Sequence, residues 1–169
     1  MSKTLLSVPL ALLILAAIPA SSAPKPAGGD AEFKELIREY CEAWSSANPD
    51  KPAPLYAKDP DLVFYDVTPL KYKGWDEYKA GVQKNLFDAM ASGALTPKDD
   101  LKVTRHGNIA WTSVTEHFSA KMKDGKAMEL DVRHTAIWEK RGGKWLIVHE
   151  HISVPVDPST GKADLESKP

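Results

Sequence analysis

The chain carries, at residues 127–154, the stretch AMELDVRHTAIWEKRGGKWLIVHEHISV, which decides the fold. Two runs of alternating apolar and polar residues flank the pair Gly142-Gly143, a pattern typical of a long antiparallel hairpin. In the first run, every second residue belongs to a mostly apolar face: Leu130, Val132, His134, Ala136 and Trp138. In the second run, the corresponding set is Leu146, Val148, Glu150, Ile152 and Val154. We predict that these two faces are buried together.

The length of the connecting turn decides which residues of the two runs face each other. A two-residue turn at Gly142-Gly143 sets an apolar face beside a polar one. A three-residue turn that also includes Arg141 avoids this mismatch and places Glu150 opposite His134. We therefore predict the longer turn, and with it two ionisable residues that meet on an otherwise apolar surface.

Further strands precede this hairpin. Consecutive strands are predicted over residues 101–105, 109–121, 127–140 and 145–154, after an earlier strand at 62–67. A two-residue turn at Asp124-Gly125 brings three residues beside the buried face of the next strand: Trp111, Ser113 and Thr115. An alternative buried face for the strand at 109–121 consists of Ala110, Val114 and Phe118.

Two amphipathic helices are predicted ahead of the main sheet. The first begins at Asp30 and carries apolar residues at helical spacing: Phe33, Leu36, Ile37, Tyr40, Cys41 and Trp44. The second follows with Trp75, Tyr78, Val82, Leu86 and Met90 at the same spacing. Helices that precede long hairpins give an α+β fold, here a cone-shaped, curved antiparallel sheet packed against the N-terminal helices.

The N-terminal segment predicts export. Lys3 precedes an apolar run over residues 5–18 that ends in small residues, so residues 1–23 are predicted to be a signal peptide cleaved within positions 20–24. We expect a flexible leader at 24–29, one domain at 30–156 and a disordered tail at 157–169. The mature protein is then secreted or periplasmic.

Composition excludes several classes of protein. The 22 basic and 23 acidic side chains give a net charge near zero, so no basic surface is expected for nucleic acid or for a membrane in the mature form. Cys41 is the single cysteine, which excludes an internal disulfide framework. Its place on the apolar stripe of the first helix predicts a buried thiol.

The order of elements and several short strings resemble the nuclear transport factor 2-like superfamily, also called SnoaL-like. Within it, the chain is most similar to the association domain of calcium/calmodulin-dependent protein kinase II. The strings that carry this likeness are Thr135-Ala136-Ile137-Trp138, Gly143-Lys144-Trp145, His149-x-His151 and Gly74-Trp75-Asp76. The arginines that line that domain's pocket have no counterpart here, since their positions fall on Ser113, Ala136 and Ile152. The resemblance implies a cone with a pocket, and the missing arginines argue against an anionic ligand like that domain's.

The candidate site lies on the concave face of the sheet. His134 and Glu150 form a pair suited to proton transfer, and Asp66 on the first strand is a third candidate catalytic residue. The alternative is an ion pair that only holds the open end of the cone together. Ligand contacts are predicted from six residues: Tyr65, Tyr78, Trp111, Ser113, Thr115 and Trp138. For Tyr78 a place in the core, and for Asp66 a place in a turn, stay open as alternatives.

The opposite sheet face predicts a contact between subunits. Four residues of the last strand alternate onto it: Trp145, Ile147, His149 and His151. The two histidines lack a third ligand, so no metal and no cofactor are expected. The leading interpretation is an exported protein that binds a small molecule as a homodimer or larger homo-oligomer. The alternatives are a cofactor-free isomerase, dehydratase or cyclase, with His134 or Asp66 as base and Glu150 or a tyrosine as acid, and an oligomerisation hub.

Overall fold

The computed structural model describes residues 29–165 and 167, and the predicted signal peptide and most of the leader lie outside them. Two helices, α1 (Gly29–Ser45) and α2 (Gly74–Asn85), are accompanied by two short 3-10 helices, η1 (Ala53–Leu55) and η2 (Phe87–Ala89). The strands are β1 (Val63–Tyr65), β2 (Tyr72–Lys73), β3 (Met90–Pro97), β4 (Lys102–His106), β5 (Ile109–Met122), β6 (Ala127–Arg141) and β7 (Lys144–Ser153). None of the helices in this part of the chain is long and apolar enough to cross a membrane.

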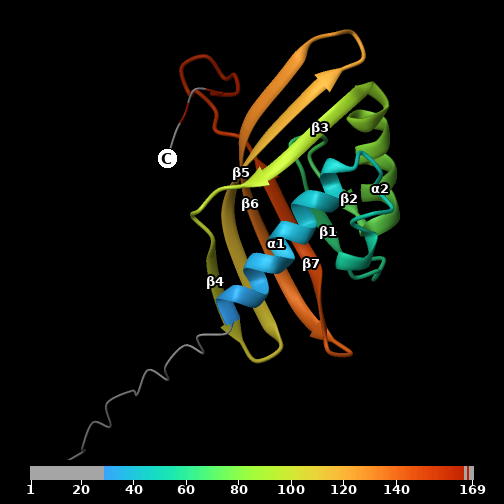
Figure 1. The fold of residues 1–169 in the computed structure, drawn as a ribbon, viewed down its shortest axis with the longest axis vertical. Helices are drawn as coiled ribbons and strands as arrows, with labels where there is room; N and C mark the ends of the chain where they lie inside the picture. Colours follow the sequence, from blue (N-terminus) through green and yellow to red (C-terminus); the bar gives the residue numbers. More distant parts are fainter. Residues whose placement is uncertain (1–28, 166, 168–169) are drawn as a thin grey trace, which may run out of the picture.

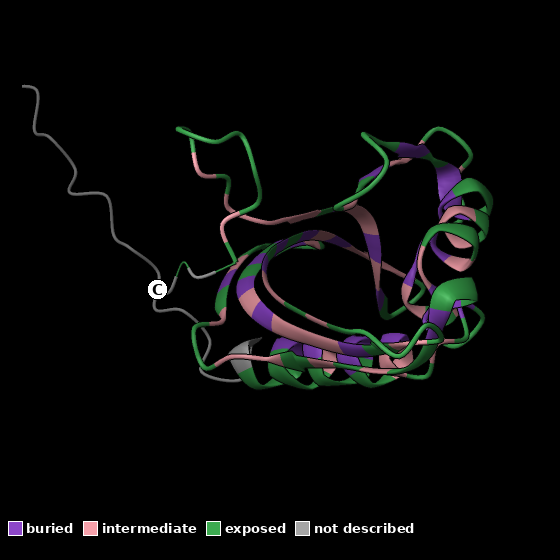
Figure 2. Cartoon of the chain, turned by 90° about the horizontal axis from the view of Figure 1, so that it is seen from above, coloured by how far each residue is buried: buried purple, intermediate pink, exposed green. Residues whose placement is uncertain are grey.

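Within the described residues, seven strands form one sheet. Its main order is β2-β1-β7-β6-β5-β3, in which β3 pairs with residues 116–122 of β5. The remaining strand, β4, pairs with residues 109–113 of β5. All pairs are antiparallel except β1 and β7. Helix α1 lies across one face of the sheet, and α2 lies beside the β1–β7 side (Figure 1). Seen from above, the strands curl and the helices close the opening (Figure 2). The predicted cone is confirmed.

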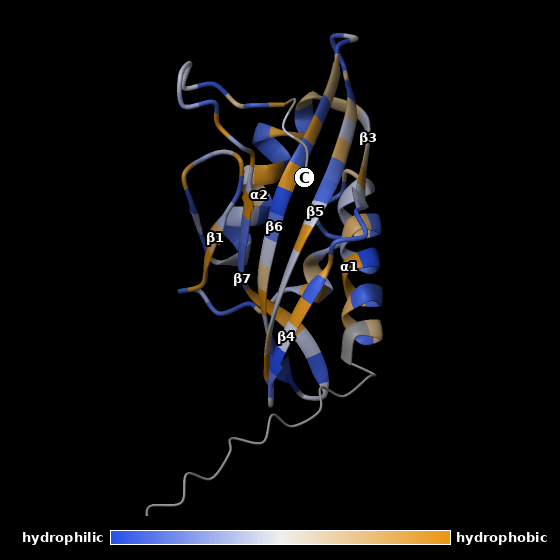
Figure 3. Ribbon diagram, turned by 90° about the vertical axis from the view of Figure 1, so that its left-hand side faces the viewer, coloured by the Kyte–Doolittle hydropathy of each residue, from blue (hydrophilic) through white to orange (hydrophobic). Residues whose placement is uncertain are grey.

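Helix α1 supplies one side of the core. Its stripe is buried as predicted, with Phe33, Ile37, Tyr40, Cys41 and Trp44 each less than a tenth exposed and Leu36 packed against them. The Cys41 thiol is free and buried. Burying aromatic side chains supplies much of the stability of a small domain that has no disulfide. Apolar and polar residues follow one another along the long strands (Figure 3), and every second residue is buried over 110–116 of β5 and 132–138 of β6.

The hairpin between β6 and β7 corrects the predicted turn. The turn has two residues, Gly142 and Gly143, with φ of 56° and 83°, and Arg141 pairs with Lys144. Both angles lie in the left-handed region that a two-residue hairpin turn requires and that glycine adopts without strain. The mismatch expected for this turn is removed further along the strands by a β-bulge, at which Val148 is skipped.

This bulge reverses the predicted faces in the first half of β7. Trp138 pairs with Ile147 and the next pair is Ile137 with His149, so the alternation restarts after Val148. Trp145 and Ile147 consequently point into the core, where they are 4% and 0% exposed. The predicted interface that contains these two residues is wrong, because alternation alone does not reveal an extra residue in a strand.

The hairpin between β5 and β6 carries the opposite correction. Lys121 pairs with Ala127, and the Met122 amide donates to the Lys126 carbonyl, so the turn has three residues and ends at Gly125 with φ of 86°. The register shifts by one residue from the predicted one. The inward residues of β5 are Ala110, Thr112, Val114 and Glu116. The predicted ligand contacts Trp111, Ser113 and Thr115 therefore lie on the outer face.

Two further segments differ from the prediction. Residues 90–97 form strand β3, which pairs with β5, although Met90 was assigned to the second helix and its Ala-Ser-Gly-Ala run has low β propensity. Residues 157–164, expected to begin a disordered tail, form a compact turn with the two residues before them. Val156 bridges to Ala163, and the Asp157 amide donates to the Lys162 carbonyl at 2.9 Å.

Candidate functional site

A row of buried ionisable groups crosses the inside of the cone. His134 on β6 lies between two carboxyl groups: its Nδ1 is 2.7 Å from Oε1 of Glu116 on β5, and its Nε2 is 3.7 Å from Oε2 of Glu150 on β7. All three side chains have no exposed surface. The ring of Tyr40 stacks on the imidazole at 4.5 Å. Three neighbouring strands and α1 thus enclose the row.

Register explains how these residues meet. Glu150 pairs with Ala136, not with His134 as predicted, and His134 pairs with Val114 and Ile152. Glu150 reaches the imidazole along the diagonal of the pleat, since side chains two positions apart on neighbouring strands still approach each other. The predicted proximity is therefore present through a different register.

Two tyrosines hold the Glu150 carboxylate. Tyr56 donates to Oε2 and Tyr78 donates to Oε1, both at 2.6 Å, and Trp44 Nε1 donates to the Tyr56 hydroxyl at 3.1 Å. Burial raises the pKa of both tyrosines, and the negative charge of Glu150 raises it further, so their hydroxyls remain donors. These bonds compensate for the loss of water around a buried carboxylate.

The charges of His134 and Glu150 each shift the pKa of the other residue. Burial lowers the pKa of His134, but Glu116, Glu150 and Asp66 outweigh this effect and raise it overall. Burial raises the pKa of Glu150, whereas His134 and the two tyrosine hydroxyls oppose the increase. A protonated imidazole between carboxyl groups is the arrangement that these directions favour.

Two polar atoms of the row lack hydrogen-bond partners among the described residues. They are Oε2 of Glu116 and Nε2 of His134. Nε2 still has Oε2 of Glu150 at 3.7 Å. An unpartnered carboxylate oxygen is costly in an apolar interior. Glu116 therefore has one oxygen available for a further donor.

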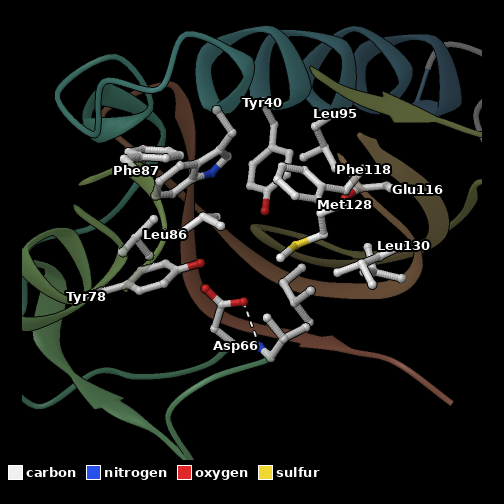
Figure 4. Close-up of a pocket in the computed structure, with 15 residues that line it drawn as sticks. Tyr40, Asp66, Tyr78, Leu86, Phe87, Leu95, Glu116, Phe118, Met128 and Leu130 are labelled. Atoms are coloured by element: carbon white, nitrogen blue, oxygen red, sulfur yellow. Dashed lines mark hydrogen bonds between the residues drawn. The ribbon is translucent and has the colours of Figure 1, made fainter. Parts of the chain in front are cut away.

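A cavity of about 110 Å³ borders this row. Its wall is mostly apolar and aromatic, and its polar members are Tyr40, Asp66, Tyr78 and Glu116. Figure 4 shows Asp66 and Glu116 on opposite sides of the lining, with the Tyr40 and Tyr78 hydroxyls directed inward. The apolar part includes Phe87, Leu95, Phe118, Met128, Leu130 and Ile152.

A wider vestibule of about 790 Å³ adjoins the cavity, and the two share the lining residues Asp66, Val67 and Ile152. Asp66 is half-buried at this boundary and accepts a 2.7 Å hydrogen bond from the Val67 amide. Burial raises the pKa of Asp66 to about 7; the charge of Glu150 adds to the effect, and the Val67 amide and Tyr78 oppose it. A carboxyl group of this kind changes its charge near neutral pH.

The other predicted ligand contacts have different places. Tyr78 lines the cavity, but Trp138 is a core residue that packs against Phe33 and donates to Thr112 Oγ1 at 3.0 Å. Tyr65 borders the vestibule from the outer sheet face, where its ring meets His149 and His151 edge-on. His149 Nδ1 also contacts the Val63 carbonyl at 2.7 Å. Among the described residues, no group of three or more His, Cys, Asp or Glu side chains is arranged so that it could hold a metal ion.

Sequence reasoning missed three members of the site: Glu116, Tyr56 and Tyr40. The available signal for Glu116 was the alternative face of β5, because Ala110, Val114 and Phe118 share their parity with it. Tyr56 lies in a proline-rich stretch without periodicity, so nothing local marked it. Tyr40 was recognised as buried, but its stacking on His134 depends on how α1 crosses the sheet.

Comparisons with known proteins agree with this architecture. Residues 34–157 match the profile of the family described as SnoaL-like domain. No curated protein matches the chain.

Among solved structures, 261 chains match. A nuclear transport factor 2-like protein of unknown function from Pseudomonas putida KT2440 is 26% identical with a TM-score of 0.69, over 84% of this chain and 97% of that one. A protein from Xanthomonas campestris, provisionally assigned as a calcium/calmodulin dependent protein kinase II association domain, is 26% identical with a TM-score of 0.61, over 82% and 91%. A nuclear transport factor 2-like superfamily protein from Salmonella enterica shares the fold at 23% identity and a TM-score of 0.70, over 79% and 96%.

Proposed function

Because the chain belongs to the SnoaL-like domain family, we propose that it binds a small, largely apolar molecule inside its cone. The observation that carries this proposal is the mostly apolar cavity of about 110 Å³, which is lined in part by Glu116 and adjoins the vestibule. Its size is close to that of a cavity of about 150 Å³ that accommodates benzene. The ligand, or the part of it that enters, is therefore about one ring in size.

The proposal is tested with a matched pair of variants and toluene as the probe. Ile152 lines the cavity, and Ile137 lies on the outer face of the neighbouring strand. Ile152→Trp should fill the cavity and abolish toluene-induced chemical-shift changes at the Met128 methyl group. Ile137→Trp should leave these changes intact. If toluene has no effect on wild-type protein, or the same effect on all three proteins, the cavity does not bind apolar molecules.

An enzymatic role is the second candidate function. The observation that favours it is the raised pKa of Asp66. A carboxyl group with a pKa of about 7 beside an apolar cavity suits general acid-base catalysis without a cofactor. Proteins of the same fold from Streptomyces avermitilis and Novosphingobium aromaticivorans are provisionally assigned as dehydratases. We propose an isomerase, dehydratase or cyclase reaction with Asp66 as base and Tyr78 as acid. Turnover that survives in Asp66→Asn would contradict this role.

We also propose export. The signal peptide predicted at residues 1–23 supports secretion or a periplasmic location. N-terminal sequencing of the protein from its own host should find a start between residues 21 and 24. A retained Met1 would contradict export.

A homodimer or larger homo-oligomer formed through the outer sheet face is proposed as well. Trp111 is 42% exposed on this face and stacks on His106, and Tyr65 lies exposed on it beside His151. Exposed aromatic residues on a sheet face are typical of subunit contacts. Light scattering should give more than the monomer mass, and Trp111→Lys should reduce it. A monomeric wild-type protein at micromolar concentration would contradict the proposal.

A further inference from the structure

Resting on the proposed binding function, we propose that the ligand of the cavity is a small protonated amine with an apolar body, and that its ammonium group is recognised by Glu116. The first observation is the charge of the lining. Its two carboxyl groups belong to Asp66 and Glu116, and no Lys, Arg or His is among the described residues that line it. Lys71 and His151 border only the outer vestibule. The cavity therefore favours a cation over an anion.

The second observation is the unpartnered oxygen. Oε1 of Glu116 contacts Nδ1 of His134, whereas Oε2 is buried and has no hydrogen-bond partner among the described residues. With His134 protonated, the row holds one cationic group against two carboxyl groups, those of Glu116 and Glu150. An ammonium group would give Oε2 a charge-assisted hydrogen bond and supply a second positive charge.

The third observation is the aromatic wall. Five aromatic side chains line the cavity: Tyr40, Trp44, Tyr78, Phe87 and Phe118. Aromatic faces attract ammonium groups, and a cage of them beside a carboxylate is a general solution for binding protonated amines. A neutral alcohol would satisfy Oε2 as a donor, but it would gain neither the charge pairing nor the cation–π attraction. Charge is thus the property that separates the two ligand classes.

The test compares three probes of nearly equal shape: benzylamine, benzyl alcohol and benzoate. Wild-type protein should bind benzylamine about tenfold or more tightly than benzyl alcohol, and benzoate least. Glu116→Gln should remove the preference for benzylamine while benzyl alcohol still binds. Glu129→Gln, at an exposed position of β6, should change nothing. Equal binding of amine and alcohol by wild-type protein, or tighter binding of benzoate, would overturn the proposal.

A second variant guards against misfolding of Glu116→Gln. Asp66 is half-buried, so Asp66→Asn should fold, and it should weaken benzylamine without weakening benzyl alcohol. An unchanged preference in this variant would remove Asp66 from the recognition of the amine.

Toluene separates this proposal from the function it rests on. If toluene binds but benzylamine is not preferred, the cavity binds apolar molecules and only the amine inference fails; if none of the probes binds, both fail.

The preference for benzylamine over benzyl alcohol should also increase from pH 6 to pH 8. Benzylamine stays protonated across this range, whereas Asp66 gains its charge near pH 7. The groups that face Asp66 are the Val67 amide, Tyr78, Glu150 and His134, and Tyr72 is also close enough to interact with its charge. Loss of the proton from His134 at higher pH acts in the same direction, because it makes the row more negative. A preference that falls over this range would contradict the proposed recognition.

Discussion

Replacing Glu116 with Gln tests the ion pair between Glu116 and His134 in the buried row. The variant keeps the shape of the side chain and leaves an oxygen that accepts from His134, but it removes the charge. We expect the pKa of His134 to fall relative to wild-type protein, because Glu116 is the largest of the contributions that raise it. Glu150→Gln should lower it less, and Glu129→Gln at an exposed site should leave it unchanged.

The distances set the order of these effects. At an effective dielectric constant of about 20, the gross attraction is about 6 kcal/mol at 2.7 Å and about 4.5 kcal/mol at 3.7 Å. Most of this attraction is cancelled by the cost of burying the charges. A charged hydrogen bond contributes about 1.5–3 kcal/mol and a neutral one about 1 kcal/mol, so Glu116→Gln should lower the free energy of unfolding by about 1–2 kcal/mol at mildly acidic pH.

The sign of the pH dependence follows from the raised pKa of His134. Its stabilising contribution is fully present below the unfolded value near 6.5 and is lost as pH rises through the folded value. The folded pKa of Asp66, about 7, lies above its unfolded value of about 3.9. The contribution of Asp66 to stability is therefore lost as pH rises between these two values. Wild-type stability should therefore fall from mildly acidic to alkaline pH, and Glu116→Gln should show a shallower fall.

Two measurements check this prediction. NMR follows the titration of the His134 ring in wild-type protein and in the three variants, and urea unfolding gives the free energy of unfolding between pH 5 and 9. If His134 in Glu116→Gln titrates as it does in wild-type protein, the two residues do not form an ion pair. A larger shift in Glu150→Gln than in Glu116→Gln would show that the order of distances is wrong.

Three further substitutions probe the scaffold by chemical denaturation. Thr112→Val leaves the buried Trp138 Nε1 donor without its acceptor and should cost about 1–3 kcal/mol; a change below 0.5 kcal/mol would contradict this bond. Gly81→Ala should destabilise by about 1–3 kcal/mol despite the better helix propensity of alanine, because the new Cβ would lie 2.0 Å from the Tyr72 ring; a more stable variant would refute this. Gly143→Ala should cost about 1–2 kcal/mol at φ of 83°, and an unchanged stability would mean that the turn is not left-handed there.

Some features could be predicted from the sequence because they depend on local pattern. The helical spacing of Phe33, Ile37, Tyr40 and Trp44 identified the face of α1 that is buried. The alternation of β6 placed His134 and Trp138 inside for the same reason. The turn signals Gly142-Gly143 and Asp124-Gly125, with the strand-like runs beside them, located both long hairpins. Periodicity is a property of neighbouring residues, so it requires no knowledge of the rest of the chain.

The turn lengths and registers could not be predicted, because each depends on a contact outside the strand concerned. The structure has two residues in the turn at Gly142-Gly143 and three in the turn that ends at Gly125, the reverse of the prediction. Both errors have one cause. A single extra residue at Val148, or in a turn, exchanges the two faces of a strand, and only packing against the helices and the neighbouring strands selects between them.

The sequence by itself therefore determined the fold class, the main amphipathic elements and the burial of His134 and Glu150. Only the tertiary structure brought Glu116, Tyr56 and Tyr78 to them, from positions 18 to 94 residues apart. A buried carboxylate is tolerated only where donors surround it, and those donors come from Tyr56 after η1, Tyr78 on α2 and His134 on β6. The row and its cavity are thus products of how the elements pack, since no local stretch contains enough partners to form them.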